Sequence, residues 1–293
     1  MASKVKIKNS TSAKKERLIY EIVIYTIMTI LAIILVFPYF FMVSKSLMTA
    51  EEAIRPAIVL LPKTPQWQNY LEILQDSGYI RAFCNTMSVI CFNLIAVSLS
   101  ATFVAFGFAR CEFFGKNALF AFMLATMMLP AVVTQIPLFQ LYNKLGWLNS
   151  LYPLTIPNIT GGGAIYIFLA RSFIQSLPKD MDNAAKIDGA GPLRRYFIVT
   201  LPLLKPVIIY IMINVFNSAW GDYYGPLVWR LNDDFPATLA YKVFYLITNK
   251  TVSNDTTHIR MAAGVFMSII PVLLFFIFQK QLIEGVAMEG IKG

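Results

Sequence analysis

The residue types that perform covalent or metal chemistry are scarce in this chain. The 293 residues include a single histidine, His258, and three cysteines, of which Cys84 and Cys91 stand seven apart in an apolar stretch. A catalytic or metal site needs several acid, base or ligand groups close together, and the sequence contains no Cys-x-x-Cys spacing. These residues give little support to an enzyme or a metalloprotein.

A second kind of chemistry, hydrogen bonding to a polar solute, is indicated around Asp222. Trp220, Tyr223 and Tyr224 flank this carboxylate. A carboxylate accepts hydrogen bonds from hydroxyl groups, and aromatic faces pack against the C–H faces of sugar rings. We expect these residues to line a path for a sugar. The alternatives are a carboxylate that simply faces water and an ordinary aromatic belt at the membrane surface.

Side-chain amides within long apolar runs extend this candidate path. They are Asn214, Asn217, Asn158 and Gln135. Asn214 and Asn217 are three residues apart, so they share one face of a helix. Polar groups at such positions are costly and often functional. Each amide alternatively bridges two helices through a hydrogen bond.

The elements that must position these residues are membrane-spanning helices. Hydrophobic residues make up 57% of the chain and charged residues 14%, against about 25% charged in a typical soluble domain. Six runs are uncharged, apart from Asp222 in the fifth, and long enough to cross about 30 Å of hydrocarbon. The runs are Ile22–Ser44, Ala82–Ala109, Asn117–Asn143, Leu145–Ala170, Pro206–Trp229 and Met261–Gln279. Because the runs are too long for barrel strands, we predict an all-α polytopic membrane protein with six transmembrane helices.

Two of these runs contain residues that disturb a helix. Pro130 and Pro137 predict kinks in the third run. The triplet Gly161-Gly162-Gly163 predicts a loosened helix in the fourth.

Charge sets the expected orientation. Placing the N-terminus in the cytoplasm puts residues 1–21, 110–116, 171–205 and 280–293 on the inner side, and these hold 16 of the 25 Lys and Arg residues. Cytoplasmic loops carry an excess of Lys and Arg. The net charge of +9 is therefore interpreted as a topology signal and not as a nucleic-acid-binding surface.

The predicted inner segment between the fourth and fifth runs carries signals for a helix, a glycine turn and a second helix. Pro178 suits a first helical position, and Asp180 and Asp182 favour the positive end of the helix dipole. Gly189 can take the left-handed conformation that ends a helix, and Pro192 opens the second helix. A short rigid helix between two spans can act as a lever for a partner protein. The alternative is an interfacial connector with no partner.

This segment resembles the signature loop of the permeases of binding-protein-dependent ABC importers, written E-A-A-x-x-x-G-A-x8-I-x-L-P. The matching residues are Ala184, Ala185, Gly189, Ala190, Leu201 and Pro202, and Asp188 matches the form typical of sugar permeases. Asn183 stands in place of the glutamate that helps to engage the ATPase, and Val199 replaces the isoleucine. Asp182 points about 100° away from Asn183 on a helix, so it is not a direct substitute.

Further segments resemble the same family along nearly the whole chain. They are 109–116, 129–138, 145–150 and the Ala219-Trp220-Gly221-Asp222-Tyr223 segment. Residues 285–293 resemble the C-terminal tail of maltose-type second permeases. The chain is also similar to permeases for alginate or pectic oligosaccharides, although no Arg or Lys lies within a predicted span. Neutral sugars therefore fit the sequence as well as acidic ones.

The resemblance implies the type I ABC importer permease fold with a cytoplasmic coupling helix. It implies a second homologous permease subunit, two ATP-binding cassette subunits, an extracytoplasmic solute-binding protein and a sugar substrate as partners, in a bacterial inner membrane. The ATPase-coupling residues would be Asp182, Asn183, Ala184, Ala185, Asp188, Gly189 and Ala190. ATP and Mg²⁺ would bind the partner ATPases, because this chain has no Gly-x4-Gly-Lys-Ser/Thr loop.

The expected organisation is a basic cytoplasmic tail over residues 1–18, one permease domain over 19–283 with its coupling loop at 172–205, and a cytoplasmic tail over 284–293. A secondary transporter or channel subunit is the alternative. Such proteins usually carry several ionisable groups within the membrane, and the predicted spans contain only Asp222.

Overall fold

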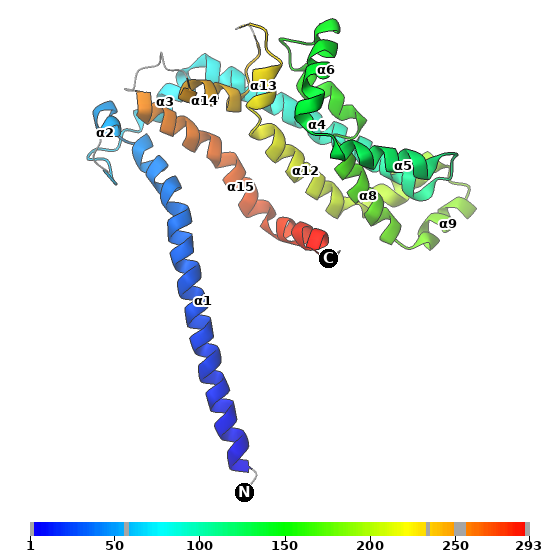
Figure 1. The fold of residues 1–293 in the computed structure, drawn as a ribbon, viewed down its shortest axis with the longest axis horizontal. Coiled ribbons are helices and arrows are strands. Elements are labelled where there is room, and N and C mark those ends of the chain that lie inside the picture. Colours follow the sequence, from blue (N-terminus) through cyan, green and yellow to red (C-terminus); the bar gives the residue numbers. More distant parts are fainter. Residues whose placement is uncertain (1–2, 56–58, 233–234, 249–255, 291–293) are drawn as a thin grey trace. The chain divides into compact units, whose positions relative to one another are not determined.

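The computed structural model describes residues 3–55, 59–232, 235–248 and 256–290, with side chains from residue 16 to residue 279 outside these gaps. Figure 1 shows a chain built from helices, and no β-strand occurs in the described ranges. The prediction of an all-α protein is confirmed. The predicted N-terminal tail 1–18 and C-terminal tail 284–293 lie largely outside the residues whose side chains are described.

The chain divides into two compact units, of which the first comprises residues 1–73 and 251–266. It contains α1 (Ser3–Ser46), α2 (Ala50–Ile54), most of α3 (Gln68–Gln75) and the start of α15 (Thr257–Gly290). Asn69 closes the loop after α1, because its Nδ2 donates to the carbonyls of Ser46 and Met48 at 2.8 and 3.0 Å. The buried amide of Asn69 thus joins α3 to the end of α1.

The second unit comprises residues 74–250 and 267–293 and is organised around one long helix, α4 (Ser77–Arg110). Helices α8 (Ala164–Ser176) and α12 (Lys205–Trp220) pack along α4. Small residues four apart on α4, Ala101 and Ala105, let the helices approach closely. The core consists of Val97, Ala101, Ala105, Phe106, Ile167, Ala170, Ile174, Tyr196, Leu204, Val207, Ile211 and Val215.

Three described helices are long and apolar enough to cross a membrane, namely 16–46, 77–110 and 257–279. Two further spans are possible if bent pairs count as one span each. One pair joins α5 (Lys116–Ala125) and η1 (Thr126–Met128) to α6 (Ala131–Lys144) with a bend of 100°. The break falls at Pro130, as predicted, whereas α6 continues through Pro137.

The fourth run, Leu145–Ala170, is divided into several short elements. The structure has α7 (Tyr152–Thr155), the 3-10 turn η2 (Ile156–Thr160), three glycines and then α8. Gly161, Gly162 and Gly163 have φ values of 106°, 62° and 133°, which L side chains rarely adopt. The predicted loosening at these glycines is confirmed, and the count of six spans stays a prediction.

The fifth run is also broken. Helix α12 ends at Trp220, and α13 (Tyr224–Val228) follows after a short turn, before α14 (Leu239–Thr248). Ahead of α12 lie α9 (Lys179–Ile187), α10 (Pro192–Arg195), the π-helical turn η3 (Tyr196–Thr200) and α11 (Leu201–Leu203). The segment 192–203 bends by 78° relative to α12.

Candidate functional site

A polar pocket of about 230 Å³ lies in the second unit where the fourth and fifth runs break. Helices α4, α7, α8 and α12, together with turn residues after α7, α12 and α13, supply its walls. The lining residues are Val89, Asn93, Pro153, Leu154, Asn158, Gly162, Tyr166, Val215, Ser218, Ala219, Asp222, Trp229 and Thr238. Asp222 and Asn158, both predicted for the substrate path, are therefore brought together.

Asp222 lies in the turn between α12 and α13. Its Oδ1 accepts a hydrogen bond from the backbone N–H of Gly225 at 2.8 Å. A Cβ atom at position 225 would lie 2.4 Å from Oδ2 of Asp222. The glycine thus lets the backbone approach the carboxylate, which holds Asp222 at the pocket wall.

Two asparagines form an amide network on the opposite wall. The Nδ2 of Asn158 donates to Oδ1 of Asn93 at 3.1 Å and to the Leu154 carbonyl at 3.1 Å. The Nδ2 of Asn93 donates to the same carbonyl at 3.0 Å. Asn158 therefore bridges helices, as the alternative interpretation held, and lines the pocket as well.

Trp229 provides an aromatic wall that the sequence did not single out. Its ring lies 5.0 Å from the Tyr142 ring and 6.4 Å from the Phe139 ring, measured between centroids. The Trp229 carbonyl accepts from the N–H of Asn149, a non-glycine residue with a φ of 61°. The sequence signal for Trp229 was its place at the end of the fifth run. The signal for Asn93 was its side-chain amide within the second apolar run.

The other predicted path residues lie outside the pocket. Trp220 is buried, and its Nε1 donates to the Met267 carbonyl at 3.0 Å. Tyr223 stacks on Phe244 with ring centroids 4.6 Å apart. The structure therefore separates Trp220 and Tyr223 from Asp222, although they are close in sequence.

Tyr224 and Gln135 contact each other between α13 and α6. The Tyr224 hydroxyl donates to Oε1 of Gln135 at 2.9 Å, and both side chains retain solvent exposure. Asn214 turns back on its own helix, donating to the Tyr210 carbonyl at 2.9 Å. Asn217 lines a separate cavity of about 440 Å³ that is otherwise apolar, so the two asparagines of α12 do not share the pocket.

The pocket offers the groups that recognise a sugar ring. A carboxylate and amides exchange hydrogen bonds with hydroxyl groups, and Trp229 adds an apolar face for C–H groups. None of these residues is a nucleophile placed beside a base. The arrangement can bind a polar solute through hydrogen bonds and an aromatic face.

The second candidate region is the hairpin formed by α9 and α10. Gly189 has a φ of 77°. Its N–H donates to the Lys186 carbonyl at 3.1 Å, and the N–H of Ala190 donates to the Ala185 carbonyl at 2.9 Å. These two bonds form a Schellman motif. The predicted helix, glycine turn and helix are confirmed, with Asp180 and Asp182 in the first turn of α9.

The hairpin buries two charged residues and exposes several apolar ones. Asp182 and Arg195 are buried and form an ion pair of 2.7 Å. Ile187 is 86% exposed, and Met181 and Leu193 are exposed as well. The predicted coupling residues Asn183, Ala184, Ala185, Asp188, Gly189 and Ala190 are exposed or half-exposed, whereas Asp182 faces inward. The hairpin therefore presents a low, partly apolar surface.

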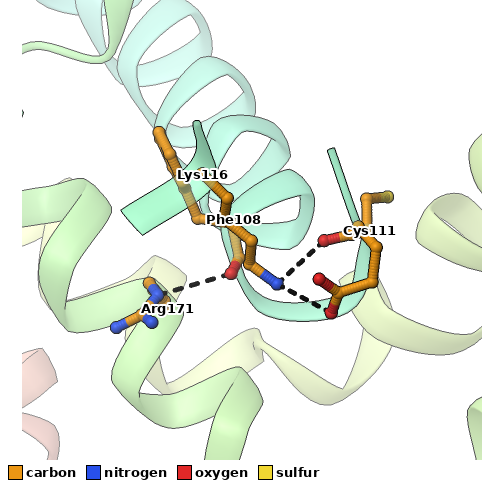
Figure 2. Close-up of polar contacts among 5 residues, drawn as sticks. Phe108, Cys111, Lys116 and Arg171 are labelled. Atoms are coloured by element: carbon orange, nitrogen blue, oxygen red, sulfur yellow. Dashed lines mark hydrogen bonds and ion pairs between the residues drawn. The ribbon is translucent and has the colours of Figure 1, made fainter. Parts of the chain in front are cut away.

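Basic residues close the neighbouring helix ends. Figure 2 shows Lys116 donating to the Cys111 carbonyl at 2.8 Å and Arg171 donating to the Phe108 carbonyl at 3.4 Å. Arg110 donates to the carbonyls of Ile174 and Leu177 at 2.8 Å each. Cations at helix C-termini satisfy free carbonyls and the helix dipole, so this end of α4 and α8 is fixed in place.

The chain is similar to oligosaccharide permeases of other bacteria. The galactooligosaccharides transport system permease protein GanQ of Bacillus subtilis is 30% identical over 285 residues, covering 96% of this chain and 98% of GanQ. The arabinooligosaccharides transport system permease protein AraQ of Halalkalibacterium halodurans is 31% identical over 268 residues, covering 90% and 93%.

A solved bacterial ABC transporter involved in the import of the acidic polysaccharide alginate has the same fold. One of its chains superimposes with a TM-score of 0.77 at 22% identity, covering 90% of this chain and 97% of that chain. The model of the binding-protein-dependent transport system inner membrane component matches residues 99–287. The chain belongs to this family of transport-system membrane components, the permease subunits of binding-protein-dependent ABC transporters.

Proposed function

We propose that this chain is the permease subunit of an ATP-driven importer in a bacterial inner membrane, and that its cargo is an oligosaccharide. The observation that carries the proposal is the α9–α10 hairpin, which exposes Met181, Ile187 and Leu193 while its Asp182–Arg195 ion pair is buried. A group of exposed apolar side chains rimmed by polar residues is typical of a protein interface. The proposed partner at this surface is an ATP-binding cassette subunit.

The cargo assignment rests on the pocket and on the relatives. GanQ and AraQ are named for oligosaccharides, and the pocket pairs a carboxylate and amides with the Trp229 ring. The pocket contains no Lys or Arg, which suits a neutral sugar. The proposed path passes Asp222, Asn158, Asn93 and Trp229.

The proposed mechanism is alternating access. Closure of two ATPase subunits around ATP and Mg²⁺ pushes α9, and the hairpin passes this motion to the helices that pack on α4. The pocket then opens toward a solute-binding protein outside the membrane and later toward the cytoplasm. A second permease subunit completes the path, and this chain holds neither nucleotide nor metal. The termini are proposed to lie in the cytoplasm.

The docking surface is tested by Ile187→Glu in the complete complex. The side chain is almost fully exposed, so folding should be unchanged while ATPase co-purification falls by about tenfold. Leu231→Glu is the matched control. Leu231 is also a largely exposed aliphatic residue of the same unit, and it lies outside the hairpin. Unchanged ATPase binding in the Ile187 variant would contradict the proposed docking surface.

The lever is tested by Gly189→Pro, which removes an N–H that donates to Lys186 and forbids the positive φ. We expect membrane insertion to survive while complex assembly or ATP-coupled uptake is lost. Wild-type uptake would argue against a lever. Uptake that persists without the ATPase but collapses with the proton gradient would instead identify a secondary transporter.

A further inference from the structure

We infer that the Asp182–Arg195 ion pair is a positioning device that sets the direction of α9, and thereby the amount of transport obtained from each ATP. The inference rests on the proposed function. Asp182 lies in the first turn of α9 and Arg195 at the end of α10. Their Oδ2 and Nη1 atoms are 2.7 Å apart, and the side chains are only 12% and 10% exposed.

The pair joins α9 to the core of the second unit. Arg195 is followed directly by Tyr196, which is 1% exposed. The Tyr196 hydroxyl lies 2.9 Å from Oγ1 of Thr102 and donates to the Leu99 carbonyl at 3.3 Å, both on α4. The Tyr196 ring also packs against Phe103 of α4, with centroids 5.2 Å apart. Through Arg195 and Tyr196, the carboxylate on α9 is thus connected to the central helix.

The entry to α9 is held by a second contact with α4. Arg110, at the end of α4, donates to the carbonyls of Ile174 and Leu177. Leu177 precedes Pro178, the residue before α9. Helix α9 is therefore attached to α4 before it begins and again through Asp182, so its axis cannot tilt freely. A force on Ile187 would move the attached helices instead of bending the loop.

Stability alone does not account for the pair. Two buried charges lose their hydration, and apolar residues of similar volume commonly fold as well or better. The contact is also incomplete, because Oδ1 of Asp182 and Nε of Arg195 are buried without a hydrogen-bond partner among the described residues. A charge-assisted hydrogen bond fixes the relative orientation of its two side chains, whereas an apolar contact does not. We therefore assign the pair to orientation.

The test compares Asp182→Leu/Arg195→Met with wild type in the reconstituted complete complex. This double substitution removes the direction of the contact and leaves no lone buried charge. We expect normal assembly and ATP hydrolysis, with oligosaccharide uptake per ATP lower by about tenfold. Arg195→Lys should stay within about twofold of wild type, because only one nitrogen makes the contact.

The Lys116–Glu112 pair supplies the control, because the Glu112 side chain is 91% exposed. Glu112→Ala should leave uptake per ATP unchanged. Wild-type coupling in the Leu/Met double variant would overturn the positioning role, as would its failure to assemble, which would make the pair a folding contact. If the wild-type complex itself imports nothing with ATP, the proposed function fails, and the two failures are thus distinguishable.

Discussion

The polar pocket and the α9–α10 hairpin lie along the same helix and use their polar residues in opposite ways. Asn93 contributes to the pocket and Arg110 to the hairpin, about 26 Å apart along α4 at 1.5 Å per residue. In the pocket, the carboxylate of Asp222 and the amide of Asn158 face a cavity. In the hairpin, the carboxylate of Asp182 forms an ion pair with Arg195, and the outer face is partly apolar.

This difference separates a surface for a solute from a surface for a protein. A pocket for sugar hydroxyls needs polar groups directed into a cavity, which the breaks at Gly161–Gly163 and Gly221–Tyr223 provide. A surface that receives force from a partner protein needs rigid internal contacts, such as the Asp182–Arg195 pair, and accessible apolar side chains such as Ile187. The pocket lies where two apolar runs are interrupted, whereas the hairpin lies between the fourth and fifth runs.

The largest expected effect is that of Asp182→Ala in the hairpin. The substitution leaves the Arg195 guanidinium buried without its partner, at a cost of about 3–5 kcal/mol in the free energy of unfolding. Thermal unfolding of the purified complex in detergent measures this loss. Asp188→Ala is the control, because Asp188 is exposed. A loss below about 1 kcal/mol would mean that the pair behaves as a surface ion pair.

Gly162→Ala probes the pocket wall and should cost less. The residue has a φ of 62°, and an added Cβ would lie 2.6 Å from both Cγ atoms of Val97. Backbone strain of about 1–2 kcal/mol adds to a packing cost of about 1–3 kcal/mol. Denaturant or thermal unfolding measures the sum, and Val97→Ala in the same chain should recover part of it. No recovery would show that the close contact with Val97 is not the cause.

Gly189→Ala is the matching change in the hairpin. Its φ is 77°, but nothing lies within 4 Å of the added Cβ. Only the backbone strain of about 1–2 kcal/mol remains. The same unfolding measurement should therefore place this variant above Gly162→Ala in stability. Equal losses would mean that the packing argument for the pocket fails.

The smallest effect is expected for Tyr196→Phe, which removes the hydroxyl contact with Thr102 and keeps the ring packing. A net loss of about 1 kcal/mol is expected for one hydrogen bond. Thr102→Val should give a similar value, and the double variant should lose less than the sum of both. Strict additivity would show that the two hydroxyls do not interact.

Local signals predicted the hairpin well. Pro178, Gly189 and Pro192 act on residues within a few positions of themselves, and the Schellman bonds follow from the glycine alone. The sequence also predicted the loosening at Gly161 and the break at Pro130 for the same reason. It did not predict the Asp182–Arg195 contact, because 13 residues and a turn separate the two.

The pocket was predicted only in part. Asp222 and Asn158 were chosen as polar residues in apolar runs, and both line it. Trp220 was expected beside Asp222 because it is close in sequence, yet its indole binds the Met267 carbonyl. Trp229 takes its place, since the turn after α13 brings it back to the cavity. Proximity along the chain does not determine direction once a helix has ended.

By itself, the sequence determined a chain of apolar helices, the places where these helices break, and the helix–turn–helix before the fifth run. These depend on hydropathy and on the φ preferences of Pro and Gly, which act locally. Only the tertiary structure decided which polar groups face a cavity and which face each other. That choice depends on how α4, α8 and α12 pack, and packing joins residues that are far apart in sequence.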